Sequence, residues 1–104
     1  MNATTGKWGL LGRMKAKPGK RDDLIAALKE SSRDVPGKLL YLFQLEQNDP
    51  DAFWINEIWE SKAAYEACLA MPQTGDWGAK LAPLLAGIEH RTETVPLDYA
   101  GGVP

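Results

Sequence analysis

The sequence predicts a single α+β domain whose elements follow the order β-α-β-β-α-β. An alternating apolar segment opens the chain, and apolar residues recur at helical spacing after it and again in the second half. Between those helices, a turn at 48–51 joins two apolar runs as a hairpin. This is the split βαβ, or ferredoxin-like, order with a four-stranded antiparallel sheet. A chain of 104 residues has room for one core.

The first strand and helix have clear patterns. A strand is predicted over 7–17, where Trp8, Leu10 and Met14 fall on one side and Pro18-Gly19 follows. The helix predicted over 20–34 has buried-type residues at i, i+1 and i+4, and two aspartates in its first turn suit the helix dipole. Val35-Pro36-Gly37 is expected to end it.

The hairpin strands, predicted over 38–47 and 52–59, are apolar on both faces. One face of the first strand carries Leu39, Tyr41, Phe43 and Leu45. A sheet covered by helices on one side normally alternates apolar and polar residues, so the second apolar face needs another explanation. The pattern predicts a homodimer in which two protomers pack sheet to sheet around a two-fold axis. The alternative is that these side chains are simply exposed.

The second helical segment is predicted in two parts. Ser61 can cap a helix over 62–70, and Thr74 or Asp76 can cap another that bends at Pro83 and ends at Gly87. A fourth strand is expected over 88–95. The domain is therefore placed at 7–96, with a flexible start at 1–6 and an extended or disordered tail at 97–104.

The composition of the chain argues against several classes of protein. The chain has 12 basic and 14 acidic residues, a net charge of -2, whereas a duplex-binding domain normally has a basic excess. Cys68 and His90 are the single cysteine and histidine, too few for an internal disulfide or a structural zinc site. We find neither a membrane-span-length apolar run nor a signal peptide, so we expect a cytoplasmic protein with no membrane, metal or nucleic-acid partner.

A cluster of aromatic and polar residues marks the candidate site. It runs from Phe53 to Ser61, where Glu57 and Trp59 point to the same side, and it continues into the next helix. Aromatic walls with a few polar groups are typical of pockets for small flat ligands. The candidate catalytic residues are Glu57, Asn56 and His90; the candidate substrate-binding residues are Trp59, Tyr65, Cys68, Trp77 and Phe43.

Each candidate also has a structural interpretation. Large aromatics commonly belong to the core, and a cysteine in an apolar stripe behaves as a small hydrophobe. Glu57 among apolar neighbours could act as a base with a raised pKa, or pair with Arg13 or Arg91. Asn56 could contact a ligand or bridge the dimer interface. His90 is either structural or a group that titrates near neutrality.

Residues from about Trp8 to Val95 resemble the antibiotic biosynthesis monooxygenase domain family, a branch of the dimeric α/β-barrel superfamily. The resemblance lies in four features: Lys17-Pro18-Gly19-Lys20, Trp59-Glu60-Ser61-Lys62-Ala63-Ala64-Tyr65, the break at Pro72, and Leu81-Ala82-Pro83-Leu84-Leu85. It implies a homodimer of ferredoxin-like protomers. It also implies oxygenation of a quinol or polycyclic phenol with dioxygen as co-substrate and no cofactor.

The resemblance suggests roles for the candidate residues. Trp59 and Tyr65 would form the ring-binding walls, Asn56 and Glu57 the polar contacts, and Cys68 the floor where many relatives carry a histidine. The haem-degrading branch has a haem-ligating histidine in the following helix, and none lies between Pro72 and Gly87 here. The leading hypothesis is a cofactor-independent monooxygenase for a small aromatic, quinol or polyketide-type substrate. The alternatives are a non-catalytic binding module for a hydrophobic metabolite, and an isomerase or lyase using a Glu or His proton shuttle.

Overall fold

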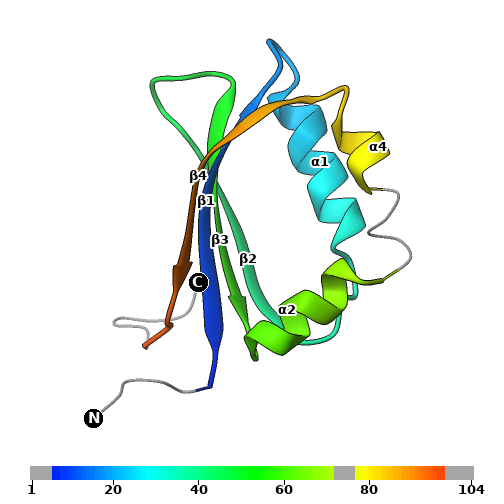
Figure 1. The fold of residues 1–104 in the computed structure, drawn as a ribbon. Coiled ribbons are helices and arrows are strands. Elements are labelled where there is room, and N and C mark those ends of the chain that lie inside the picture. Colours follow the sequence, from blue (N-terminus) through cyan, green and yellow to red (C-terminus); the bar gives the residue numbers. More distant parts are fainter. Residues whose placement is uncertain (1–5, 72–76, 98–104) are drawn as a thin grey trace.

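The computed structural model describes residues 6–71 and 77–97, and it confirms the ferredoxin-like arrangement (Figure 1). A four-stranded antiparallel sheet in the order β2-β3-β1-β4 has its helices on one face. The elements are β1 (Trp8–Ala16), α1 (Arg21–Ser31), β2 (Lys38–Leu45), β3 (Ala52–Trp59), α2 (Lys62–Leu69), α4 (Trp77–Leu81) and β4 (Leu85–Thr94). Most of the predicted flexible start and tail, the break at Pro72 and the caps at Thr74 and Asp76 lie outside the described residues.

The last strand differs most from its predicted bounds. β4 begins at Leu85 instead of Ile88, and Gly87, expected to end a helix, lies within the strand. Helix α4 ends at Leu81, two residues before Pro83, because the proline ring cannot continue a helix. The chain then joins the sheet directly, and the Lys17 amide donates to the Leu84 carbonyl at 2.8 Å.

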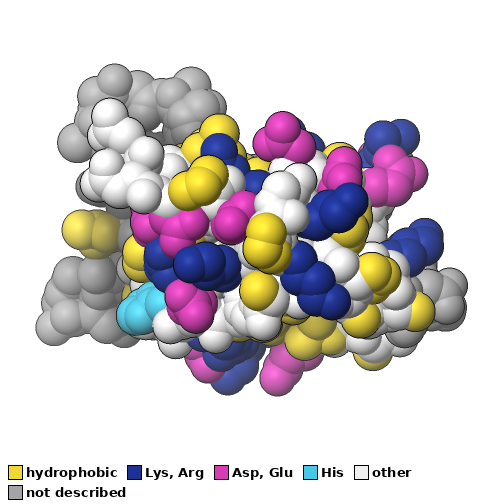
Figure 2. Space-filling view, turned by 90° about the horizontal axis from the view of Figure 1, so that it is seen from above, with side chains coloured by type: hydrophobic (Ala, Val, Ile, Leu, Met, Phe, Trp, Pro, Cys, Tyr) yellow, Lys and Arg dark blue, Asp and Glu magenta, His cyan; other side chains and the backbone are white. Residues whose placement is uncertain are grey.

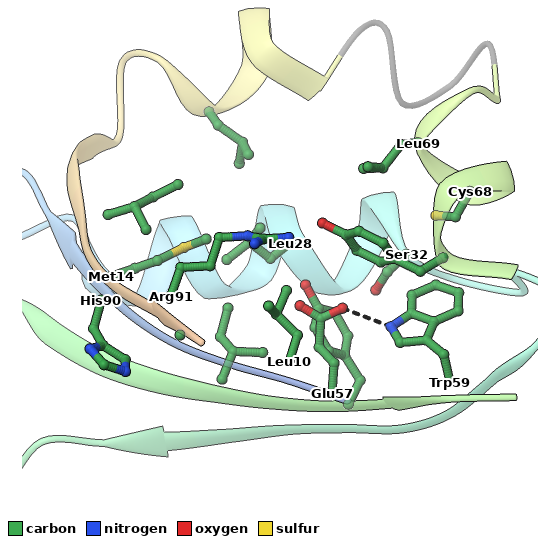
Figure 3. A pocket seen from close by; sticks show the side chains of 16 residues that line it. Leu10, Met14, Leu28, Ser32, Glu57, Trp59, Cys68, Leu69, His90 and Arg91 are labelled. Carbon is green, nitrogen blue, oxygen red and sulfur yellow. Dashed lines mark hydrogen bonds between the residues drawn. The ribbon is translucent and has the colours of Figure 1, made fainter. Parts of the chain in front are cut away.

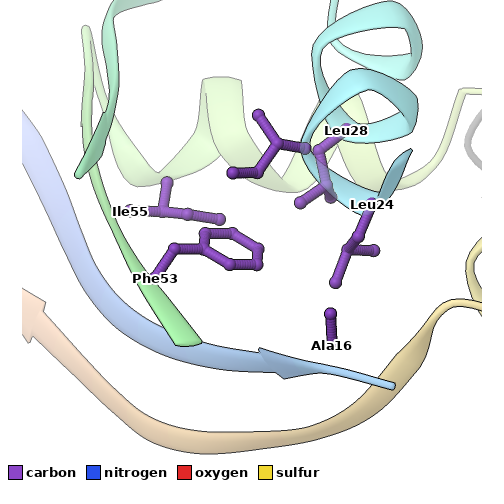
Figure 4. Packing of buried hydrophobic residues seen from close by; sticks show 6 residues of the cluster. Ala16, Leu24, Leu28, Phe53 and Ile55 are labelled. Atoms are coloured by element: carbon purple, nitrogen blue, oxygen red, sulfur yellow. The ribbon is translucent and has the colours of Figure 1, made fainter. Parts of the chain in front are cut away.

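The core has two parts, both on the helix-covered face. One joins α1 to β1 and β3, with Phe53 and Leu24 fully buried; it consists of Ala16, Leu24, Ile25, Leu28, Phe53 and Ile55 (Figure 4). The other lies under α2 and consists of Trp8, Leu10, Val35, Trp59 and Cys68. The α1 stripe is the predicted one, and it fixes that helix against the central strands.

Irregular pairing changes which face two strands present. The register moves from Lys38 opposite Trp59 to Leu40 opposite Ile58, so Leu39 is an extra residue. It is exposed and does not share the face of Tyr41, although the strict alternation had predicted that it would. On β4 the pairing moves from Ile88 opposite Met14 to His90 opposite Arg13, and Glu89 is the extra residue. An extra residue of this kind breaks the strict alternation of faces along a strand.

The uncovered face of the sheet is charged at one end. Arg13 makes two hydrogen bonds of 2.8 Å to the Glu46 carboxylate and pairs with Glu89 at 2.6 Å, and Lys15 pairs with Asp49 at 2.9 Å. Seen from above, the end of the molecule shows basic and acidic side chains side by side (Figure 2). None of the described helices is long and apolar enough to cross a membrane.

Candidate functional site

A cavity of about 240 Å³ lies between the helix-covered face of the sheet and the helices (Figure 3). Most of the side chains around it are apolar, and a few polar groups reach it from β2, β3, β4 and α2 and from Ser32, which follows α1. The cavity is lined by Leu10, Gly12, Met14, Leu28, Ser32, Tyr41, Ile55, Glu57, Trp59, Tyr65, Cys68, Leu69, Leu81, Ile88, His90 and Arg91. Apolar walls with a small number of polar groups suit a small, largely apolar ligand.

The carboxyl group of Glu57 is the main acidic group in this cavity. The indole Nε1 of Trp59 donates a hydrogen bond of 2.9 Å to one of its oxygens, Oε1. Burial raises the pKa of Glu57 above its ordinary value, while the Trp59 hydrogen bond and the nearby charges of Lys38 and Arg91 act in the opposite direction. Glu57 is therefore a stronger proton acceptor than an exposed glutamate, and its orientation is set by the neighbouring indole.

Aromatic rings form the wall at the α2 end. The Tyr65 ring lies 4.5 Å from the Trp8 ring and 5.6 Å, edge-on, from the Trp59 ring, measured between centroids. The start of α2 holds Tyr65 in this place, because the Ser61 hydroxyl accepts a hydrogen bond from the Ala64 amide at 3.0 Å. Such aromatic contacts stabilise a fixed wall more than the buried area alone would.

Two cations approach the cavity from opposite edges of the sheet. Arg91 on β4 has its pKa raised, first by a hydrogen bond with Tyr65 and then by nearby carboxylates. On β2, Lys38 lies 4.9 Å above the centre of the Tyr41 ring and donates to the Ser32 carbonyl. Burial lowers the pKa of Lys38 and raises that of the Tyr41 hydroxyl, which is therefore protonated across the physiological range.

Four of the predicted site residues come together here. Glu57, Trp59, Tyr65 and Cys68 all line the cavity, from two elements that adjoin at Ser61. Cys68 is buried beside the aromatic wall. Trp77 begins α4, and its side chain lies outside the described part of the chain.

The other predicted residues lie elsewhere. Asn56 pairs with Leu11 and Leu42 on the uncovered face, because it neighbours Glu57 on a strand and successive side chains alternate. The Phe43 ring packs against the core, 6.1 Å from the Phe53 ring, and does not line the cavity. The prediction that Asn56 and Phe43 lie at one site with Glu57 is therefore wrong, because neither side chain lines the cavity.

His90 touches the edge of the cavity, but its imidazole lies on the uncovered face. The ring is 5.8 Å from that of Trp54, and its Nε2 is 2.6 Å from the Thr92 hydroxyl. Figure 3 shows it apart from the side chains that surround Glu57. The extra residue Glu89 explains this placement, because it turns His90 outward and Arg91 inward.

Residues 9–80 match the family model of the antibiotic biosynthesis monooxygenases. The chain belongs to this family. A solved candidate antibiotic biosynthesis monooxygenase from Chloroflexus aurantiacus is 42% identical, with a TM-score of 0.84 over 91% of this chain and 97% of that one. SnoaB, a cofactor-independent oxygenase from Streptomyces nogalater solved as its N63A mutant, is 13% identical and shares the fold, with a TM-score of 0.77 over 91% and 97%.

An uncharacterized protein from Synechocystis is 31% identical over 78 residues. The match covers 72% of this chain and 53% of the Synechocystis protein, so the chain spans about half the length of that relative.

Sequence reasoning missed two polar residues that line this monooxygenase-family cavity, Tyr41 and Arg91, and one that lies beside it, Lys38. Tyr41 was predicted only as a sheet residue, Arg91 only as one of two partners for Glu57, and Lys38 only as the start of a strand. Both cations approach the cavity beside irregularities in strand pairing, and nothing in the local sequence marks these. Within residues 6–71 and 77–97, no three His, Cys, Asp or Glu side chains gather where they could hold a metal ion.

Proposed function

We propose that this protein is a cofactor-independent monooxygenase that oxidises a small, flat phenol or quinol with dioxygen as co-substrate. One observation carries the proposal: the Glu57 carboxyl, oriented by Trp59, lies at the base of an apolar cavity with aromatic walls. Family membership and the fold shared with a cofactor-independent oxygenase support it. The substrate itself would supply the electrons, and the protein would bind, deprotonate and shield it.

Each part of the cavity has a task in this reaction. Glu57 accepts the proton of the substrate hydroxyl, and its raised pKa suits it to that role. Arg91, beside Tyr65, provides positive charge that stabilises the phenolate formed. Apolar walls exclude water from the electron-rich ring. A phenol with a free ring position then reacts with O₂ to give a quinone and water, so one oxygen atom enters the ring and the other leaves as water.

Oxygen uptake with a panel of phenols and quinols tests the proposal. We expect substrate-dependent uptake by the wild type, label from ¹⁸O₂ in the product, and about a hundredfold slower turnover in Glu57→Gln, which keeps the shape but not the base. Glu60→Gln is the matched control, because Glu60 is an exposed carboxylate three residues away that does not line this cavity. Equal rates in the wild type and Glu57→Gln would contradict the role of Glu57.

The same assay separates the other candidate functions. Turnover that continues without oxygen indicates an isomerase or lyase. Ligand-induced thermal stabilisation with no product in air indicates a binding module, because a ligand that binds only the folded state raises its melting temperature.

We also propose that two copies pair through the uncovered face of the sheet. Beyond its charged end, this face carries Leu11, Leu42 and Ile58, of which Leu42 is 37% exposed in the single chain. Burying these side chains would remove an apolar surface from water. Light scattering should give twice the chain mass, and Leu42→Lys should lower it toward one chain. A wild type that scatters as a monomer at micromolar concentration would contradict the pairing.

A further inference from the structure

Gly12 is a glycine in the middle of a central strand whose backbone does not require one. It does not have a positive φ, and a Cβ added there would meet only the His90 carbonyl oxygen, at an ordinary contact distance of 3.5 Å. Glycine inside a strand weakens the strand, and it often marks a place where a ligand or another backbone approaches closely. Gly9 is the contrast: a Cβ there would collide with the Thr94 side chain, so packing explains that glycine.

The empty space above Gly12 belongs to the cavity. Leu10 and Met14 flank it along β1, Ile55 pairs with it on β3, and Arg91 pairs with it on β4. Figure 3 shows Arg91 between Met14 and Leu10. Because Gly12 has no side chain, the cavity reaches the strand backbone here, beside Arg91.

Gly12 lies two residues along the sheet from Glu57. Glu57 pairs with Leu10 on β1, and each strand residue advances about 3.4 Å, so Glu57 and Gly12 lie about 7 Å apart along the strand direction. A single benzene ring whose hydroxyl contacts Glu57 and whose face meets Trp59 stops short of Gly12. Two or three fused rings would extend over it.

We propose that Gly12 determines the size of the substrate, by leaving a flat floor on which the second or third fused ring lies beside Arg91. This inference rests on the proposed function, because it assumes that the phenol end of the ligand contacts Glu57.

The alternative is that Gly12 only gives Arg91 room to reach Tyr65. A side chain at position 12 would then displace Arg91 and weaken every ligand that depends on its charge, whatever the number of rings. Ligand size therefore separates the two explanations.

The experiment measures binding by NMR titration with two probes, 1,8-dihydroxyanthraquinone for three rings and 1,4-dihydroxybenzene, under argon, for one. For Gly12→Val we expect about tenfold weaker binding of the three-ring probe and less than about threefold change for the one-ring probe. Gly12→Ala should also weaken binding of the three-ring probe more than that of the one-ring probe, with a smaller difference between the two. Gly87→Val is the matched control, because Gly87 is a strand glycine with open space at its Cβ position, away from this cavity.

Each result has a defined meaning. Gly12→Ala should melt at or above the wild-type temperature, since its Cβ would make only an ordinary contact with the His90 carbonyl oxygen, and a cooperative melting transition checks that Gly12→Val is folded. Equal weakening of both probes, or no weakening of the three-ring probe, would overturn the role of Gly12 and leave the proposed function standing. A wild type that binds neither probe would overturn both.

Discussion

Trp59→Phe should raise the pKa of Glu57 by removing its hydrogen-bond donor while keeping an aromatic ring in the wall. The bond is 2.9 Å from Nε1 to Oε1. A hydrogen bond to a charged group contributes about 1.5–3 kcal/mol. Because one pKa unit corresponds to about 1.4 kcal/mol, the pKa should rise by about 1–2 units. Phenylalanine is smaller and admits some water, so we expect the lower end of that range.

The sign of the stability effect follows from the direction of the shift. Burial already holds the pKa of Glu57 above its ordinary value. The folded state therefore binds this proton more tightly than the unfolded state, and stability falls as the pH rises through the interval between the two pKa values. Trp59→Phe raises the folded-state pKa further and so widens the interval between the two pKa values. Its destabilisation should be larger at about pH 8 than at about pH 4.

The assay is a ¹³C NMR titration of the Glu57 carboxyl, assigned by its absence from Glu57→Gln, together with chemical unfolding at both pH values. In the Glu57→Gln background the pH-dependent part of the Trp59→Phe effect should vanish, leaving only the packing loss. An unchanged or lowered Glu57 pKa in Trp59→Phe would refute the reasoning, and so would a pH-dependent part that persists in the double mutant.

Three other predictions concern stability. Phe53→Ala should cost about 3–5 kcal/mol in urea unfolding, since the ring is fully buried and leaves a cavity; a cost below about 1 kcal/mol would contradict the packing described. Ser61→Ala should cost about 1 kcal/mol through loss of the bond to the Ala64 amide, whereas Ser61→Asp should retain most of it. The pKa of Glu46 is held at about 2, first by its hydrogen bonds to Arg13. The ionised Glu46 side chain should thus stabilise the fold above the ordinary glutamate pKa, and this stabilisation should be lost as the pH falls toward about 2. The melting temperature of the wild type should fall over this acid range, and that of Glu46→Gln should lack this part of the decline.

The fold and the aromatic wall could be predicted because their signals are local. Alternation places Trp8, Leu10 and Met14 on one side of β1, and helical spacing identifies the buried stripe of α1. The same alternation puts Glu57 and Trp59 on one face as predicted, although the hydrogen bond between them was not. Only Glu60 and Ser61 separate β3 from α2, so Tyr65 is close to Trp59 in the sequence as well as in the fold.

The opposite edge of the site could not be predicted, because it depends on how distant strands pair. Whether His90 or Arg91 faces the helices is decided by the extra residue at Glu89, which arises only when β4 pairs with β1. Lys38 lies over Tyr41 beside a similar shift on β2. Asn56 was grouped with Glu57 by sequence proximity, although neighbours on a strand face opposite ways.

The extra residue at Glu89 also gives this edge of the cavity a simple way to change its chemistry. If β4 paired regularly here, with Glu89 opposite Arg13, His90 would lie opposite Gly12 and residue 91 would turn outward, bringing an imidazole to the place of the guanidinium. A permanently charged guanidinium would be exchanged for a smaller ring with two hydrogen-bonding nitrogens. A one-residue change in strand pairing would thus keep the backbone and the aromatic wall while presenting a different side chain to a substrate anion.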